Sequence, residues 1–182
     1  YGQHLILTRE GRAPGGAAAP VIGLISHLDT VYPLIEEQAN DFTFRIAGER
    51  IYGPGTVDIK GGTVMIWLIL TALRQHAPEV FEDTTWKLIW NSSEECFSPD
   101  FGDVCRAHFS PGTLAALVFE SEGRLGKESR LVVARKGRGS WRATVSGRGS
   151  HAGGKHDHGA NAIVQLGRTV QRIAALTDYA RG

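Results

Sequence analysis

Runs of apolar residues predict four strands in the first two thirds of the chain. Residues 21–25 are apolar apart from one glycine, and residues 86–91 and 114–119 are rich in large apolar side chains. Near-continuous runs of this kind are typical of strands that are buried on both faces of a parallel sheet. A shorter segment, 4–9, predicts one more strand near the start of the chain.

Segments with helical periodicity alternate with these strands. Residues 62–76 predict a strongly apolar helix that stops before Pro78. Residues 101–109 and 160–177 predict two amphipathic helices. Their apolar sides carry Phe101, Val104, Cys105 and His108 in the first helix, and Ile163, Leu166, Val170 and Ile173 in the second. Alternating strands and helices predict an α/β fold.

Two further parts of the chain predict smaller elements. Residues 41–51 alternate in polarity and contain turn residues, which predicts a peripheral hairpin. Residues 131–134 and 141–145 predict two strands on either side of a basic, glycine-containing stretch. Because the character of the sequence changes there, we place a domain boundary near Lys136, between domains at 1–135 and 136–182.

The composition limits the classes of partner. The 182 residues suffice for one full domain, or for one domain and part of another. Since 20 Lys and Arg nearly balance 19 Asp and Glu, and the apolar run 64–70 is too short to cross a bilayer, we expect neither a nucleic-acid nor a membrane partner. Two cysteines, Cys96 and Cys105, fit a reducing compartment, and we expect a cytoplasmic protein. The chain begins with Tyr1 rather than Met, so a leader sequence that precedes Tyr1 is an alternative.

Side chains that bind divalent metals follow three of the predicted strands. They are His27 and Asp29, then Glu94 and Glu95, then Glu120, and Asp58 lies in the Gly- and Pro-rich loop 53–62. The carboxyl ends of strands in open α/β sheets are the usual place for ligands. A mixture of imidazole and carboxylate suits zinc or a related divalent ion. The sequence therefore indicates a metal site at this edge.

Taken alone, the adjacent acids Glu94 and Glu95 are typical of a solvated acidic loop. Neighbouring side chains diverge along a strand, and acidic residues are mostly solvated. If the chain turns after residue 91, both carboxylates can converge on one cation. One would then be a ligand, and the other would take a proton from water.

Five ordered motifs carry a resemblance to a known family. They are residues 27–31 (His-Leu-Asp-Thr-Val), residues 53–62, Glu94-Glu95, Phe119-Glu120, and residues 149–153 (Gly-Ser-His-Ala-Gly). Together they closely resemble the zinc-dependent aminoacylase and carboxypeptidase superfamily, in particular its glutamate carboxypeptidase-like branch. The resemblance implies a three-layer catalytic domain with a mostly parallel mixed sheet. The start of an α+β lid, or dimerisation, domain would follow.

The resemblance also implies a site with two zinc ions, for which cobalt or manganese are alternatives. Asp58 would bridge the two ions and would precede a loop that often contains a cis peptide. His27 and Glu120 would hold one ion, and Glu95 the other. Asp29 would orient His27 from behind.

Two catalytic roles follow from the same resemblance. Glu94 would be the general base that activates water and later protonates the leaving amine. His151 would reach the active site of a partner subunit in a homodimer and stabilise the oxyanion there. The final His ligand and a lid arginine of the family lie beyond Gly182, so we expect this chain to be part of a longer protein.

The function that these features predict is metal-dependent hydrolysis of an amide bond next to a carboxylated amino acid, such as a C-terminal glutamate. The substrate would be a small peptide or an N-acyl amino acid. N-acyl amino acid deacylation and dipeptide cleavage are alternatives within the superfamily. A binding or dimerisation module without catalysis is the alternative of another class.

Other motifs carry less weight. The stretch 147–152 formally matches the dinucleotide-binding fingerprint, but glycines rather than a helix follow it. No Gly-x-Ser-x-Gly elbow surrounds Ser150, which argues against a serine hydrolase. The basic stretch 135–138 is better explained as a solvated edge than as a phosphate site.

Overall fold

The computed structural model describes residues 2–12, 15, 17–121, 131–137 and 139–181. The chain divides into two compact units, residues 1–130 and 131–182, which are described separately below.

The first unit contains a four-stranded sheet in the order β1-β5-β2-β6. These strands are β1 (Leu5–Arg9), β2 (Val21–His27), β5 (Thr85–Asn91) and β6 (Thr113–Val118). Strand β1 is antiparallel to β5, whereas β5, β2 and β6 are parallel. The mixed, mostly parallel sheet and its α/β class are as predicted, and all four strands were expected close to their observed bounds.

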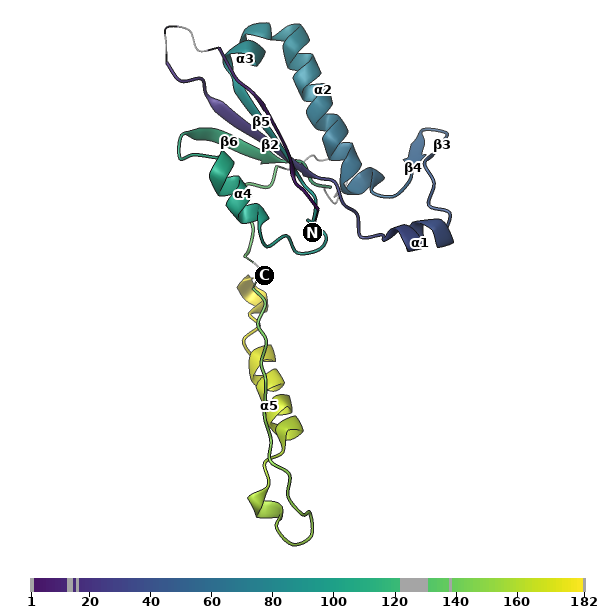
Figure 1. The fold of residues 1–182 in the computed structure, drawn as a ribbon, viewed down its shortest axis with the longest axis vertical. Coiled ribbons are helices and arrows are strands. Elements are labelled where there is room, and N and C mark those ends of the chain that lie inside the picture. Colours follow the sequence, from purple (N-terminus) through teal and green to yellow (C-terminus); the bar gives the residue numbers. More distant parts are fainter. Residues whose placement is uncertain (1, 13–14, 16, 122–130, 138, 182) are drawn as a thin grey trace. The chain divides into compact units, whose positions relative to one another are not determined.

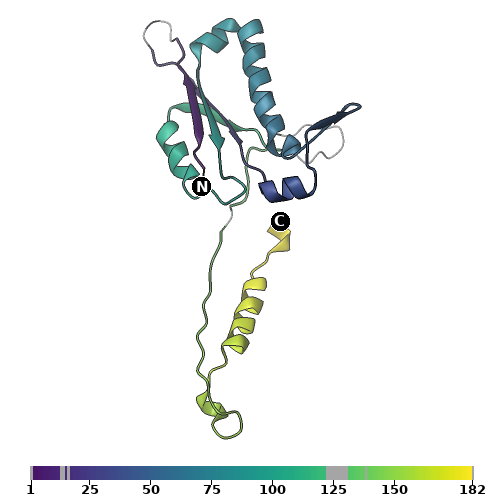
Figure 2. The same cartoon turned by 45° about the vertical axis from the view of Figure 1, so that its right-hand side comes forward.

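Helices cover both faces of this sheet (Figures 1 and 2). Helix α2 (Gly61–His76) packs on one face, where Leu24, Ile66 and Trp86 form the buried core. Helix α4 (Phe101–His108) lies on the other, where the Lys87 ammonium donates to the carbonyl of His108. The side of α4 expected to be apolar is the half-buried one. Side chains alternate between the two faces along each strand, so both faces of the sheet can pack against a helix, which gives three layers.

The carboxyl ends of β2, β5 and β6 meet at one edge of the sheet. His27 at the end of β2 is paired with Asn91 at the end of β5. The backbone N–H of Phe119, just after β6, donates to the carbonyl of Ile25 at 2.9 Å. The segments that follow the three strands therefore leave the sheet side by side.

Small elements connect the strands and helices of the first unit. Strands β3 (Arg45–Ala47) and β4 (Arg50–Tyr52) form the expected hairpin. Helices α1 (Leu34–Ala39) and α3 (Pro78–Asp83) were not predicted. Pro78 ends the preceding helix, as expected, but also opens α3, because proline is well tolerated in the first helical turn.

The helical run Thr56–His76 is long and apolar enough to cross a membrane by length and composition alone, with a mean hydropathy of 1.4. The apolar run 64–70, on which the expectation of no membrane partner rests, is part of this longer segment. Core helices of soluble proteins meet the same criterion, and Gly62 and Ile66 of α2 are buried within the first unit.

The second unit contains helix α5 (Ala162–Ala174), which the sequence predicted, and short 3₁₀ turns at His156–His158 and Tyr179–Arg181. The side chain of Asn161 caps α5 by accepting from the N–H groups of Ile163 and Val164. The strands predicted at 131–134 and 141–145 are wrong for the described residues. Segments rich in strand-forming residues become strands only when they pair with a neighbouring strand, and the described part of this unit contains no such neighbour.

Candidate metal centre

His27 is the buried centre of the candidate site. Its side chain is only 1 % exposed. Nδ1 lies 3.0 Å from the carbonyl oxygen of Asp29, and Nε2 lies 2.9 Å from Oδ1 of Asp58. Both partners only accept hydrogen bonds. The imidazole therefore either carries two protons or directs a bare Nε2 at a cation.

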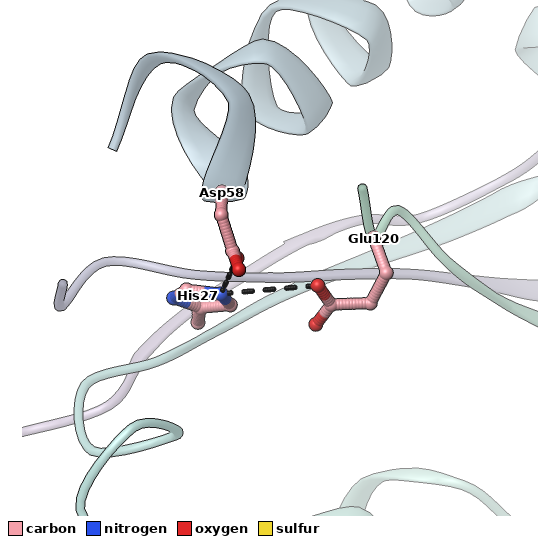
Figure 3. Close-up of side chains that lie close together, drawn as sticks. All are labelled: His27, Asp58 and Glu120. Atoms are coloured by element: carbon pink, nitrogen blue, oxygen red, sulfur yellow. Dashed lines mark hydrogen bonds and ion pairs between the residues drawn. The ribbon is translucent and has the colours of Figure 1, made fainter. Parts of the chain in front are cut away.

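Asp58 and Glu120 approach His27 from two different elements (Figure 3). Asp58 lies in the segment Thr56–Lys60 before α2, at a point where the backbone is not helical, and Glu120 follows β6. An Oε2 atom of Glu120 is 3.9 Å from Nε2 of His27. One ligand atom from each of the three residues lies within 4.8 Å of the others.

The loop after β5 turns both of its acids toward the same histidine. Ligand atoms of His27, Glu94 and Glu95 form a second group, also within 4.8 Å of one another. Glu94 is exposed and Glu95 is half-buried. The chain thus turns after residue 91, and the two carboxylates converge instead of diverging as strand neighbours would.

Asp29 joins the two strand ends through both its backbone and its side chain. Its carbonyl accepts from Nδ1 of His27, and its carboxylate accepts from the backbone N–H groups of Glu94 at 3.1 Å and Glu95 at 3.0 Å. The sequence suggested an orienting role toward His27. The hydrogen bonds from the backbone of Glu94 and Glu95 to the Asp29 carboxylate depend on the turn after β5, and no pattern in the sequence predicts them.

Two glycines allow the Asp58 loop to reach the site. Gly55 has a left-handed backbone with φ of 64°, which favours glycine. A Cβ atom on Gly62 would lie 2.5 Å from the carbonyl oxygen of Phe119, so the start of α2 can touch the chain next to Glu120 only because this side chain is missing. The peptide bond between Asp58 and Ile59 is cis, as the resemblance implied.

The surroundings of His27 raise its pKa. Burial alone lowers the pKa, but the hydrogen bonds to Asp58 and to the Asp29 carbonyl, with the charges of Glu120 and Glu94, outweigh burial. The net pKa lies above the ordinary 6.5. Without a cation, the carboxylates therefore favour the charged form of the imidazole.

The carboxylates show the complementary effect. Burial raises the pKa of Glu95, and repulsion from Asp58 and Glu94 raises it further. Burial also raises the pKa of Glu120, against the opposing attraction of His27. Crowded, partly desolvated acids of this kind are relieved by protons or by a bound cation.

The donor set fits a divalent ion of the zinc type. Zinc bonds to imidazole nitrogen and carboxylate oxygen are about 2.0–2.2 Å long, so two ligand atoms on one ion lie roughly 3–4 Å apart. The His27–Glu120 separation of 3.9 Å falls in that range, and the 2.9 Å contact with Asp58 lies just below it. The bond from Nδ1 to the Asp29 carbonyl is the contact that usually fixes a metal-binding histidine.

His151 belongs to the second unit. Its Nδ1 accepts from the N–H of Gly154 at 3.1 Å, within an exposed turn. Its assignment to the site stays a prediction.

Comparison with known proteins identifies the family. Residues 23–168 match the model of the peptidase family M20/M25/M40. The chain belongs to this family. The match covers most of both units and confirms the resemblance that the five motifs indicated.

Individual M20/M25/M40 relatives are carboxypeptidases by name. The chain is 29 % identical to carboxypeptidase G2 of Pseudomonas sp. (strain RS-16) over 158 residues, which are 87 % of this chain and 36 % of that protein. It is 28 % identical to a probable carboxypeptidase of Arthroderma benhamiae over 144 residues, or 77 % of this chain and 29 % of the relative. The chain thus spans about a third of the length of these relatives.

Proposed function

We propose that the protein containing this chain is a metal-dependent carboxypeptidase. It hydrolyses an amide bond next to a carboxylated amino acid, such as a C-terminal glutamate, in a small peptide or N-acyl amino acid. The observation that carries the proposal is the convergence of four carboxylates on one buried histidine whose two nitrogens both face acceptors. The similarity to carboxypeptidases supports the same reaction and favours release of a C-terminal residue.

The proposed site would hold two zinc ions, or cobalt or manganese in their place. His27, Asp58, Glu95 and Glu120 would be the residues that hold them. When bound, the metal supplies Lewis acidity toward the scissile carbonyl and the attacking water. The pKa of Glu95 and Glu120 is raised without a cation, which is the state that a bound cation relieves.

Glu94 is the proposed general base. Its carboxylate is exposed, so substrate and water can reach it, whereas Glu95 is half-buried and better suited to a fixed ligand role. Glu94 takes a proton from the attacking water and returns it to the leaving amine. His151 is proposed to stabilise the oxyanion of the tetrahedral intermediate, in a homodimer formed through the second unit.

Exchanging the two glutamates separately tests these roles. Glu94→Gln is expected to keep the metal content and to lower kcat by roughly 10²–10⁴-fold, the usual loss for an acid–base group. Glu95→Gln is expected to lose metal. Metal is measured by elemental analysis and turnover by release of glutamate from an N-acyl glutamate, with the exposed Glu79→Gln in α3 as control.

Four outcomes would contradict the proposal in different ways. If Glu94→Gln lost its metal while Glu95→Gln kept it, the two roles would be reversed. Hydrolysis of N-acyl amino acids without activity on peptides would favour a deacylase. Cleavage of dipeptides alone would favour a dipeptidase. A full-length protein that bound no metal would be a binding or dimerisation module.

A further inference from the structure

The loop that carries Glu94 and Glu95 is closed by a cluster of three polar side chains: Asn91, Ser93 and Ser98. Oδ1 of Asn91 accepts from the backbone N–H of Ser93 at 3.0 Å and from the hydroxyl of Ser98 at 2.9 Å. The two serine hydroxyls lie 2.9 Å apart. Asn91 and Ser93 are only 4 % and 2 % exposed.

The direction of these bonds follows from the number of protons. Each serine hydroxyl has one proton to donate. Ser98 donates its proton to Asn91. The proton of the Ser93 hydroxyl has two acceptors within reach, the Ser98 hydroxyl at 2.9 Å and Oδ1 of Asn91 at 3.5 Å. The shorter contact gives a chain of bonds from Ser93 to Ser98 to Asn91, in which each bond polarises the next.

Asn91 also connects this cluster to the strand that carries His27. Its backbone carbonyl accepts from the N–H of Leu28 at 2.7 Å, and its Cα lies opposite that of His27 in the sheet. The carboxylate of Asp29 holds the same loop through the N–H groups of Glu94 and Glu95. The loop is therefore fixed at its base by Asn91 and at its tip by Asp29.

The contact of Ser98 spans the loop. Residues 91 and 98 are its two ends, and Glu94 and Glu95 lie between them. A buried polar cluster contributes less packing energy than apolar side chains of the same size would, so stability alone is a poor explanation for it. Its geometry instead fixes one loop shape.

We propose that Ser98 is a positioning residue of the metal centre. By donating to Asn91 it closes the 91–98 loop and holds Glu94 and Glu95 in the direction of His27. The effect on catalysis rests on the proposed function. The effect on the loop does not.

Ser98→Ala in the complete protein that contains residues 1–182 tests the proposal. Hydrogen exchange at the amides of Glu94 and Glu95 is expected to rise by at least about tenfold in the metal-free protein, because loop opening becomes easier. Zinc affinity is expected to fall, and kcat to fall by roughly 10–10²-fold with KM little changed, the cost of a misplaced catalytic group. Ser98→Thr, which keeps the hydroxyl, is expected to restore all three quantities.

Ser110→Ala, at an exposed serine outside the loop, is the matched control and should change none of them. Unchanged exchange at Glu94 and Glu95 in Ser98→Ala would overturn the proposal, whatever happens to activity. So would a failure of Ser98→Thr to restore the exchange rates. If the unsubstituted protein bound no zinc, the proposed function would fail, while faster exchange in Ser98→Ala would still support the role of Ser98 in the loop.

Discussion

At the scale of single residues, His27 limits what the site can do. It is buried, and both of its nitrogens face hydrogen-bond acceptors. A histidine placed this way has two stable states, a doubly protonated ring among carboxylates and a neutral ring bound to a cation. Proton and metal therefore compete for the same position beside Nε2.

This competition predicts how stability depends on pH without metal. The raised pKa of His27 gives stability that is complete below its unfolded pKa and is lost as pH rises through its folded pKa. The raised pKa values of Glu95 and Glu120 act in the same direction, since their folded forms hold protons above the ordinary 4.5. In the presence of a chelator, Tm should fall as pH rises from about 5 to 8.

Calorimetry with a chelator and with excess zinc measures this effect. Zinc should reverse the trend, because its ligands bind only when deprotonated. Glu120→Gln should make Tm fall less steeply with rising pH in the presence of the chelator. Comparing the Tm of this variant with that of the unsubstituted chain cancels the contributions of other charged pairs. An equally steep fall in Glu120→Gln would show that the pH dependence arises elsewhere.

At the scale of elements, the contact between α2 and the end of β6 determines where Asp58 lies. Gly62→Ala would put a methyl group 2.5 Å from the carbonyl oxygen of Phe119 and 2.8 Å from a side-chain carbon of Ile59. We expect a loss of about 1–3 kcal/mol in the free energy of unfolding, as for other overpacked sites. Urea denaturation measures this loss.

Gly102→Ala in α4 is the matched control. The nearest atoms to its added methyl would be those of the Arg106 guanidinium, the closest at 3.6 Å, which is ordinary contact. This variant should be neutral or more stable by about 0.4–1 kcal/mol, because alanine restricts the unfolded chain. Equal effects of the two substitutions would argue against the close approach at Gly62.

The strands that hold the site were predictable because their signal is local. Residues 21–25 and 86–91 are apolar enough to indicate burial without knowledge of their neighbours. The metal-binding residue types after each strand end follow from the sequence in the same way. Helices α1 and α3 were missed because each is a six-residue segment, too short for a periodic signal.

Features that depend on distant parts of the chain could not be predicted. The strands expected at 131–134 and 141–145 required partners that β propensity does not specify. Asn91 and Ser98 are ordinary polar residues in the sequence, and only the turn of the loop brings them together. The hold of Asp29 on Glu94 and Glu95 joins residues 65 and 66 positions apart.

At the scale of the whole molecule, the apolar side of α5 predicts an assembly. Ile163, Val170 and Ile173 are 81 %, 57 % and 58 % exposed within the described residues. An apolar helix side of this kind usually packs against another surface. We expect it to contribute to a homodimer of the complete protein.

Ile173→Glu tests this assembly by sedimentation velocity. The dimer Kd should rise at least about tenfold, which corresponds to the loss of one well-packed interface side chain. Gln171→Glu introduces the same charge at an exposed polar position of the same helix and should leave the dimer intact. A complete protein that is monomeric at micromolar concentration would contradict the prediction.

The way β2, β5 and β6 lie side by side also sets the order in which the site can form during synthesis. The ribosome must release the chain well beyond Glu120 before His27, Asp58 and Glu120 can meet, and parallel strands pair only across long connections. A nascent chain that has exposed only His27 and Asp58 cannot yet complete this ligand set. Capture of a metal ion by this ligand set should therefore mark the end of sheet assembly in the first unit, and not its beginning.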